Sequence, residues 1–257
     1  MDELNINEVI SDKLYTIEYN QSNIIQIRQI QGEFYEFQKF KVIDNEQSGF
    51  RKIAGNKLKT YCKANSIILS TDVRDYDNPI ISFLEHTGFL VKFVKILYQK
   101  NLNEHEIKYK DLFSYHPISE IGLTDFLNIF EKTKESKEEA PGETETTFNE
   151  LLEYAGDKYD PSNWKAVKLG DKYMGVILPV LYADKEKWGT VFHIGLLPEE
   201  RNKGYGRILH AKSLDMLKKQ GVLKYIGSTN IYNKPMIRVF ELNGCKEWFK
   251  RKFYCTG

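Results

Sequence analysis

The pattern of hydrophobic and polar positions in the first part of the chain predicts strands interleaved with two helices. Runs rich in β-branched and aromatic residues, with partial alternation, predict the strands. Asn78-Pro79 is a typical entry to the second helix, and Gly88 closes it. The predicted strands are Leu14–Tyr19, Ile24–Ile30, Phe34–Val42, Ser66–Ser70 and Phe89–Gln99. The predicted helices are Phe50–Ala64 and Ile80–Thr87.

The second part of the chain has the same two kinds of pattern, with one polar interruption. Helical spacing predicts Leu123–Glu131, Phe148–Tyr154, Tyr205–Lys219 and Lys234–Leu242. The predicted strands are Trp164–Leu169, Tyr173–Tyr182, Thr190–Leu197, Lys224–Ser228 and Glu247–Tyr254. The glutamate-rich segment Glu131–Glu150 predicts a solvated loop, and an acidic rim beside a site for a basic group is the alternative.

The two ends of the chain resemble each other when Phe50–Asn65 is laid on Gly206–Gly221. The sequence FLEHTGF, which begins at Phe83, then falls on VFELNGC, which begins at Val239. A shared order of helix, strand, Asn, helix and Gly favours a duplication over chance. The chain is therefore predicted to be α/β (α+β), with a degenerate partial domain at residues 1–108 and a second domain at 109–257.

Composition narrows the class of protein. The 37 Lys and Arg nearly cancel the 36 Asp and Glu in 257 residues, which disfavours a nucleic-acid partner. No apolar stretch approaches the roughly 20 residues that a membrane-spanning helix needs. The three cysteines have no metal-ligand spacing, which predicts reduced thiols, no metal and a cytoplasmic location.

One short motif carries candidate chemistry. Arg201-Asn202-Lys203-Gly204-Tyr205-Gly206 stands between a predicted strand and a predicted helix. Glycine lets the backbone approach a ligand closely, and a helix N-terminus offers free N–H groups and partial positive charge. The motif therefore indicates a phosphate-binding loop. It lacks the spacing of a dinucleotide fingerprint or a P-loop.

In this context the sequence resembles the GNAT superfamily of acetyl-CoA-dependent N-acetyltransferases. The resemblance rests on HIGLLPEERNKGYG (193–206), a strand at 224–228, Asn233, and FELNGC (240–245). It covers about Phe113–Gly257 well and Gln29–Asn101 as a degraded partial copy. It implies the GNAT fold, in which helices flank a mixed central sheet, with a second, partial GNAT-like domain at the N-terminus.

The resemblance also implies a binding site for acetyl-CoA as co-substrate. Backbone groups of Ile194 and Leu196 would bond the pantetheine arm, which enters between two strands that the family forces apart. Backbone N–H groups of Arg201–Gly206 would hold the pyrophosphate. Asn233 would support the pantetheine or the thioester from the far side.

The catalytic positions of the family are altered in this sequence. The strand position that carries Glu or His in many members falls on Thr190, and the usual Tyr position falls on Phe240. Two substitutes are candidates. His193 lies on the predicted strand and could act as a base if a β-bulge re-aims it, or it could be structural. Tyr232 could protonate the leaving thiolate, or it could be a packing aromatic.

The sequence thus predicts an N-acetyltransferase that joins acetyl-CoA and an amine acceptor, expected to be a small molecule, by direct attack in a ternary complex. Deprotonation by water is the alternative to His193 and Tyr232. A peptide or protein amine is a second kind of acceptor. A non-catalytic module that binds acyl-CoA or a partner protein is the rival function. A homodimer stays open.

Overall fold

The computed structural model divides the chain into two compact units. It describes residues 6–11, 13–19, 23–42, 49–73, 78–106, 108–134, 147–182 and 185–257. The first unit is Met1–Lys95 together with Phe249–Gly257, and the second is Ile96–Trp248. The predicted division of the sequence into two related domains, 1–108 and 109–257, stays a prediction.

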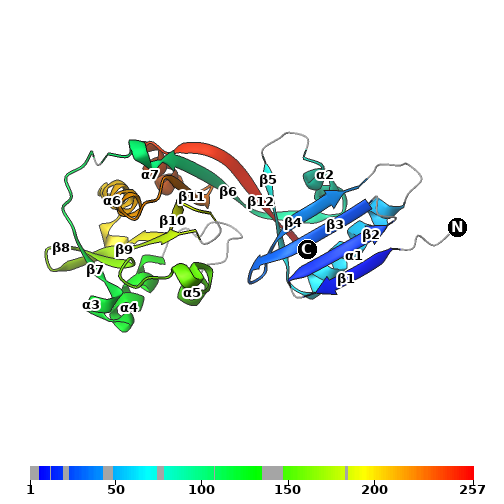
Figure 1. Ribbon diagram of the computed structural model, residues 1–257, viewed down its shortest axis with the longest axis horizontal. Coiled ribbons are helices and arrows are strands. Elements are labelled where there is room, and N and C mark those ends of the chain that lie inside the picture. Colours follow the sequence, from blue (N-terminus) through cyan, green and yellow to red (C-terminus); the bar gives the residue numbers. More distant parts are fainter. Residues whose placement is uncertain are drawn as a thin grey trace. The chain divides into compact units, whose positions relative to one another are not determined.

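The first unit is built on a sheet that helices cover on one face (Figure 1). Its strands are β1 (Asn7–Ser11), β2 (Leu14–Tyr19), β3 (Asn23–Gln31), β4 (Phe34–Lys41), β5 (Ile68–Val73) and the first part of β6 (Phe89–Asn101). Its helices are α1 (Phe50–Ala64) and α2 (Pro79–His86). Strands β1 to β4 form an antiparallel meander, β5 runs parallel to β4, and the last part of β12 (Lys246–Thr256) runs antiparallel to β5.

Alternation along the strands fixes the core of the first unit. Every second side chain of β2 and β3 points to the same face. The buried side chains on that face pack against the apolar stripes of α1 and α2. They include Tyr15, Ile17, Ile25, Ile27, Phe50, Ala54, Leu58, Phe83 and Leu84.

The second unit has helices on both faces of its sheet (Figure 1). Its strands are β7 (Ser114–Pro117), β8 (Lys165–Leu169), β9 (Lys172–Leu181), β10 (Trp188–Leu196) and β11 (Lys224–Asn230), with parts of β6 and β12. Its helices are α3 (Ile118–Ile121), α4 (Leu123–Lys134), α5 (Phe148–Ala155), α6 (Tyr205–Lys219) and α7 (Lys234–Leu242), with short 3-10 turns at Leu102–Glu104, Gly156–Lys158 and Pro198–Glu200.

Strand β9 supplies hydrophobic side chains to both faces of the second unit, as expected of a strand buried on two sides. Val176, Leu178 and Val180 pack with α4 and α5. Met174 and Ile177 pack with α6. The neighbouring strand β10 therefore directs some of its side chains to the face of the sheet that α4 covers and others to the face that α6 covers. We call these the α4 face and the α6 face.

The two units repeat the same order of elements. In each, an antiparallel meander ends in a strand that leads to a long helix, a parallel strand and a shorter helix. In the second unit α3, α4 and α5 lie between the first two strands of the meander, whereas β1 and β2 of the first unit follow each other closely in the sequence. This common order is what the duplication predicts.

Most of the predicted elements are confirmed, and the differences are local. Strand β1 was not predicted, because its residues are exposed along their whole length and lack a buried alternating face. The helix α3 is a single turn that the apolar pattern cannot resolve from α4. Of the predicted acidic loop Glu131–Glu150, residues 135–146 lie outside the described residues.

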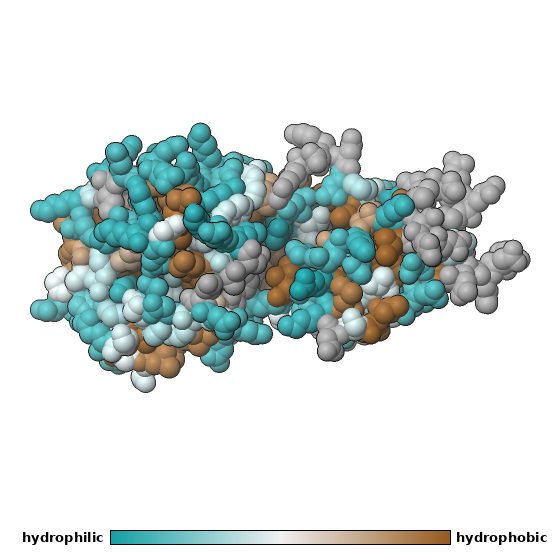
Figure 2. Space-filling model, viewed as in Figure 1, coloured by the Kyte–Doolittle hydropathy of each residue, from teal (hydrophilic) through white to brown (hydrophobic). Residues whose placement is uncertain are grey.

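The face seen in Figure 2 is mostly hydrophilic over the described residues, with hydrophobic side chains in groups among them. The exposed hydrophobic residues include Val9, Ile10, Ile53, Leu90 and Val91 in the first unit. Among the described helices, none is long and apolar enough to span a membrane.

Candidate functional site

Strands β10 and β11 form a fork in the second unit. Their parallel ladder pairs Trp188 with Lys224 and Gly189 with Tyr225, and it ends there. Both strands continue beyond that point, β10 to Leu196 and β11 to Asn230. Separated parallel strands leave backbone donors and acceptors without a ladder partner, so the fork can take an extended polar ligand. Ile194 and Leu196, two of the predicted binding residues, lie in the open part of β10.

The predicted phosphate loop leads from the open end of β10 to α6. Gly204 is the N-cap of α6 and has a left-handed backbone (φ 79°), which glycine adopts without strain. Its neighbour Asn202 also has a positive φ of 63°. No side chain caps the start of α6, so the N–H groups of the first turn are left to a ligand or to water. This geometry suits an anion.

The charged side chains of the loop have partners within the protein. The guanidinium of Arg201 donates to the carbonyl oxygens of Leu196 (3.1 Å) and Thr133 (3.0 Å). Lys203 forms an ion pair of 2.9 Å with Glu200, which also pairs with Lys172. The side chain of Glu200 is buried, and its two lysine partners hold its pKa below the usual range.

A β-bulge in β10 re-aims His193. Val191 pairs with Pro179 and His193 pairs with Leu178, so Phe192 is the additional residue. Val191 packs on the side of α6 and α7, and alternation places Thr190 on the opposite, α4 face. The bulge returns His193 to that face, where its ring lies 4.9 Å from the ring of Phe130 on α4. His193 therefore shares a face with the position that carries the base in the resembled family.

The environment of His193 keeps the imidazole neutral. Desolvation, together with the positive charges of Lys134 and Arg201, lowers its pKa to about 4. Its Nε2 atom lies 2.9 Å from Oγ1 of Thr133. Among the described residues, its Nδ1 atom has no hydrogen-bond partner. A neutral imidazole with a free nitrogen can accept a proton.

The predicted residues on the other arm of the fork follow the end of β11. Asn233 is the N-cap of α7, where its side chain accepts a hydrogen bond from the N–H of Met236 (3.1 Å). Tyr232 is 63% exposed, so it is not the packing aromatic that we considered as the alternative. Phe240 is buried and stacks on Tyr98, and it offers no proton.

His210 forms a buried network on α6 beneath the fork. Nδ2 of Asn243 donates to its Nδ1 (3.0 Å), so its Nε2 carries the proton and donates to the hydroxyl of Tyr225 (3.1 Å). Burial lowers the pKa of His210 to about 3. His210 is thus a buried packing residue.

The low pKa of His210 predicts a loss of stability in acid. The unfolded chain binds a proton near pH 6.5 and the folded chain only near pH 3, so the free energy of unfolding falls as the pH is lowered through this window. The contribution of this residue is at most about 1.4 kcal/mol per pH unit. Urea titrations of the wild type and His210→Gln should show a shallower pH dependence in the variant. An equal dependence in both proteins would contradict this assignment.

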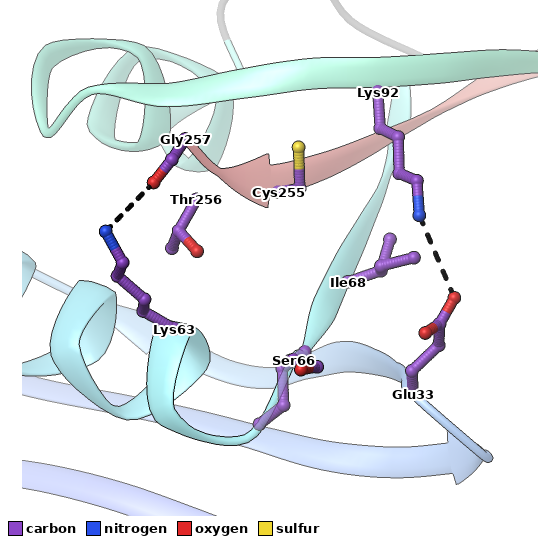
Figure 3. A pocket seen from close by; sticks show the side chains of 9 residues that line it. Glu33, Lys63, Ser66, Ile68, Lys92, Cys255, Thr256 and Gly257 are labelled. Atoms are coloured by element: carbon purple, nitrogen blue, oxygen red, sulfur yellow. Dashed lines mark hydrogen bonds and ion pairs between the residues drawn. The ribbon is translucent and has the colours of Figure 1, made fainter. Parts of the chain in front are cut away.

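A pocket of about 410 Å³ lies in the first unit, and none of the predicted site residues lines it. Lys63 donates to the carbonyl of Gly257, and Lys92 pairs with Glu33, so both lysines of the pocket have partners (Figure 3). Among the residues that the structure describes, no three His, Cys, Asp or Glu side chains gather into a metal site.

Sequence reasoning missed Thr133, which contacts both His193 and Arg201. Nothing in the local pattern separates this residue from other polar positions near a helix end. Only the packing of α4 across the sheet brings it to β10.

Comparisons with known proteins agree with this geometry. The profile of the Acetyltransferase (GNAT) family matches residues 123–244, within the second unit. No curated protein matches the sequence significantly.

Solved structures share the fold over nearly the whole chain. A GCN5-related N-acetyltransferase from Sphaerobacter thermophilus is 12% identical, with a TM-score of 0.67 over 94% of this chain and 79% of that one. A tandem GNAT protein from the clavulanic acid biosynthesis pathway is 10% identical, with a TM-score of 0.58 over 94% and 81%. A GNAT-family acetyltransferase from Colwellia psychrerythraea is 12% identical, with a TM-score of 0.57 over 94% and 85%. Residues 123–244 therefore match the GNAT acetyltransferase family, and these solved structures share the fold of this chain.

Proposed function

We propose that the second unit transfers an acetyl group from acetyl-CoA to an amine. The observation that carries the proposal is the fork between β10 and β11, which opens beside the uncapped N-terminus of α6. An extended cofactor arm with a pyrophosphate matches both features: a polar chain for the open strand edges and an anion for the free N–H groups.

The residues of the fork and loop fit acetyl-CoA. Backbone groups of Ile194 and Leu196 would bond the pantetheine arm. The N–H groups of Arg201, Asn202, Lys203, Gly204, Tyr205 and Gly206 would hold the pyrophosphate, and Asn233 would approach from the opposite arm. In this arrangement the two cationic side chains of the loop would hold the loop and not the phosphates, because Arg201 binds carbonyl groups and Lys203 binds Glu200.

The proposed reaction is a direct attack in a ternary complex. The lone pair of the amine forms the C–N bond to the thioester carbonyl carbon, and the carbonyl electrons move to oxygen. Their return breaks the C–S bond and releases the thiolate of coenzyme A. His193 takes the proton that the amine loses, and Tyr232 supplies one to the thiolate. Both residues lie at the fork, His193 on β10 and Tyr232 after β11.

We propose a small-molecule amine as the acceptor, with a peptide amine as the second candidate. The acidic segment that could favour a basic acceptor lies mostly outside the described residues. The first unit repeats the order of elements without the helices between β1 and β2, and Gly49, not a glycine-rich turn, precedes α1. Its proposed role is structural support or shaping of the acceptor site.

The rival function is a non-catalytic module that binds acyl-CoA. It is favoured by Thr190 and Phe240, which stand where the resembled family has an acid–base pair. The rival shares the fork and the loop with the enzyme, so coenzyme binding alone does not separate them.

Turnover decides between the two functions. The full-length protein is mixed with acetyl-CoA and a panel of aminoglycosides, polyamines, amino acids and peptides, and the released thiol and the acetylated product are measured. The proposal expects amine-dependent thiol release and a product heavier by one acetyl group. Coenzyme binding without turnover on the whole panel would favour the non-catalytic module.

The position of Arg201 leads to a prediction about coenzyme affinity. Its guanidinium holds two carbonyl groups and is not free for phosphate, so Arg201→Gln should weaken acetyl-CoA binding by no more than about tenfold, through disorder of the loop. Calorimetry at two salt concentrations measures this. A loss of a hundredfold or more that disappears at high salt would show direct contact with phosphate instead.

A further inference from the structure

Thr133, near the C-terminal end of α4, connects the proposed base to the coenzyme loop. Its hydroxyl contacts the ring of His193, and its backbone carbonyl accepts a hydrogen bond from Arg201. We infer that Thr133 is a positioning residue that fixes His193 as the Nε2–H tautomer and leaves Nδ1 as the proton acceptor. This inference rests on the proposed function.

The hydrogen bonds of the Thr133 hydroxyl determine its role. A hydroxyl has one proton to donate and lone pairs with which to accept. That proton is committed to the carbonyl oxygen of Phe130, at 2.6 Å within α4. The contact of 2.9 Å to Nε2 of His193 must then be one in which Thr133 accepts, so Nε2 carries a hydrogen.

The charge state of His193 completes the assignment. A protonated imidazole has hydrogens on both nitrogens, and a neutral one has a hydrogen on only one. The cationic groups that face the ring, Lys134 on α4 and Arg201 on the loop, disfavour the protonated form, as does desolvation. With Nε2 as the donor, Nδ1 keeps its lone pair, and it has no partner among the described residues.

Close packing holds the ring in this orientation. A Cβ placed on Gly195 would lie 2.6 Å from Nε2 of His193 and 2.5 Å from Oγ1 of Thr133, so a side chain at this position would displace the pair. The ring of Phe130 packs edge-on against the imidazole. Glycine at position 195 therefore makes room for the bond between Thr133 and His193.

Arg201 links Thr133 to the proposed coenzyme loop. Its guanidinium bridges the carbonyls of Thr133 and Leu196, and so ties the end of α4 to the end of β10. The residue that opens the coenzyme loop thereby holds the residue that orients the base. Thr133 thus contacts both the loop, through its backbone carbonyl, and His193, through its hydroxyl.

The test compares Thr133→Val, which keeps the shape of the side chain but loses the acceptor, with Thr133→Ser, which keeps the hydroxyl. ¹⁵N-labelled full-length protein at neutral pH gives the tautomer of His193 from two-bond nitrogen–proton correlations, with His193→Gln to assign the signal. We expect only the Nε2–H tautomer in the wild type and Thr133→Ser. In Thr133→Val the Nδ1–H tautomer becomes populated.

Kinetics on the same variants separate positioning from a general loss of structure. In Thr133→Val, kcat should fall between about tenfold and a hundredfold while the KM for acetyl-CoA changes less than twofold, and Thr133→Ser should restore kcat. An Nδ1–H tautomer in the wild type, or an unchanged tautomer and kcat in Thr133→Val, would overturn the inference. The tautomer is read without substrate, so it still decides the inference if no acceptor is found and the proposed function fails.

Discussion

Replacing Gly206 by tryptophan is expected to abolish acetyl-CoA binding. A Cβ at this position meets Cγ2 of Val239 at 3.5 Å, which is ordinary contact, so alanine fits there and an indole does not. The indole must either cover the first turn of α6 or displace α7 from the fork. In the first case the N–H groups lose access to the pyrophosphate. In the second case Asn233, the N-cap of α7, leaves its place at the fork. Thermal shift and calorimetry should show at least a hundredfold loss of affinity.

Two controls make this result specific. Gly206→Ala should bind acetyl-CoA within about threefold of the wild type, because a single methyl group has room. Arg51→Ala, at the matching position of the first unit, should leave binding unchanged, since Arg51 contacts Ser82 on α2 and stands outside the fork. Normal affinity in a folded Gly206→Trp protein would exclude this loop as the coenzyme site.

The second large effect is expected on turnover. His193→Gln removes the proposed base. The glutamine side chain can still donate a hydrogen bond to Thr133, so the surrounding residues are disturbed little. We expect kcat to fall by about a hundredfold to ten-thousandfold with the affinity for acetyl-CoA unchanged. Steady-state kinetics and calorimetry on the same preparation measure both. An unchanged kcat would assign the deprotonation to water.

A double variant tests the location of the base. Thr190 shares the α4 face with His193, so Thr190→Glu in the His193→Gln background should recover part of the lost kcat. Thr190→Gln in the same background is the isosteric control and should recover none.

The pH profile provides a further check on His193. A protonated imidazole cannot act as a base. Because the pKa of His193 is about 4, the enzyme should lose the contribution of this residue only in acid. In a plot of log kcat/KM against pH, one limb reflects deprotonation of the acceptor amine. The position of this limb should change with the pKa of the acceptor. The slope should steepen below about pH 4 for every acceptor. A common limb near pH 6.5 would indicate an unperturbed histidine.

Most of the helices and strands could be predicted from the sequence, for reasons that are local. The helix α1 was predicted to the residue because its apolar stripe is regular. The helix α2 was predicted to within one residue at each end because Asn78 and Pro79 form a typical helix start. The fork was expected only through the resemblance, since pairing between strands that are distant in sequence leaves no local pattern.

The roles of the site residues stay predictions, and the contacts that the structure shows around them could not be read from the sequence. In the sequence, Arg201 and Lys203 are cations of a glycine-rich loop with no evident protein partner. Their actual partners, Thr133 and Glu200, come from tertiary packing and from a buried ion pair. The bulge at Phe192 was anticipated as a condition for His193, and the structure has it. Thr133 could be found only once α4 was placed on the sheet.

We propose that the chain has a single coenzyme site and that this site is the fork beside α6. Calorimetric titration of the full-length protein with acetyl-CoA tests it most directly, because it counts sites as well as measuring affinity. We predict one molecule bound per chain, with the heat lost in Gly206→Trp and kept in Gly206→Ala and Arg51→Ala. Two molecules per chain, or no heat and no thermal shift at millimolar acetyl-CoA, would contradict it.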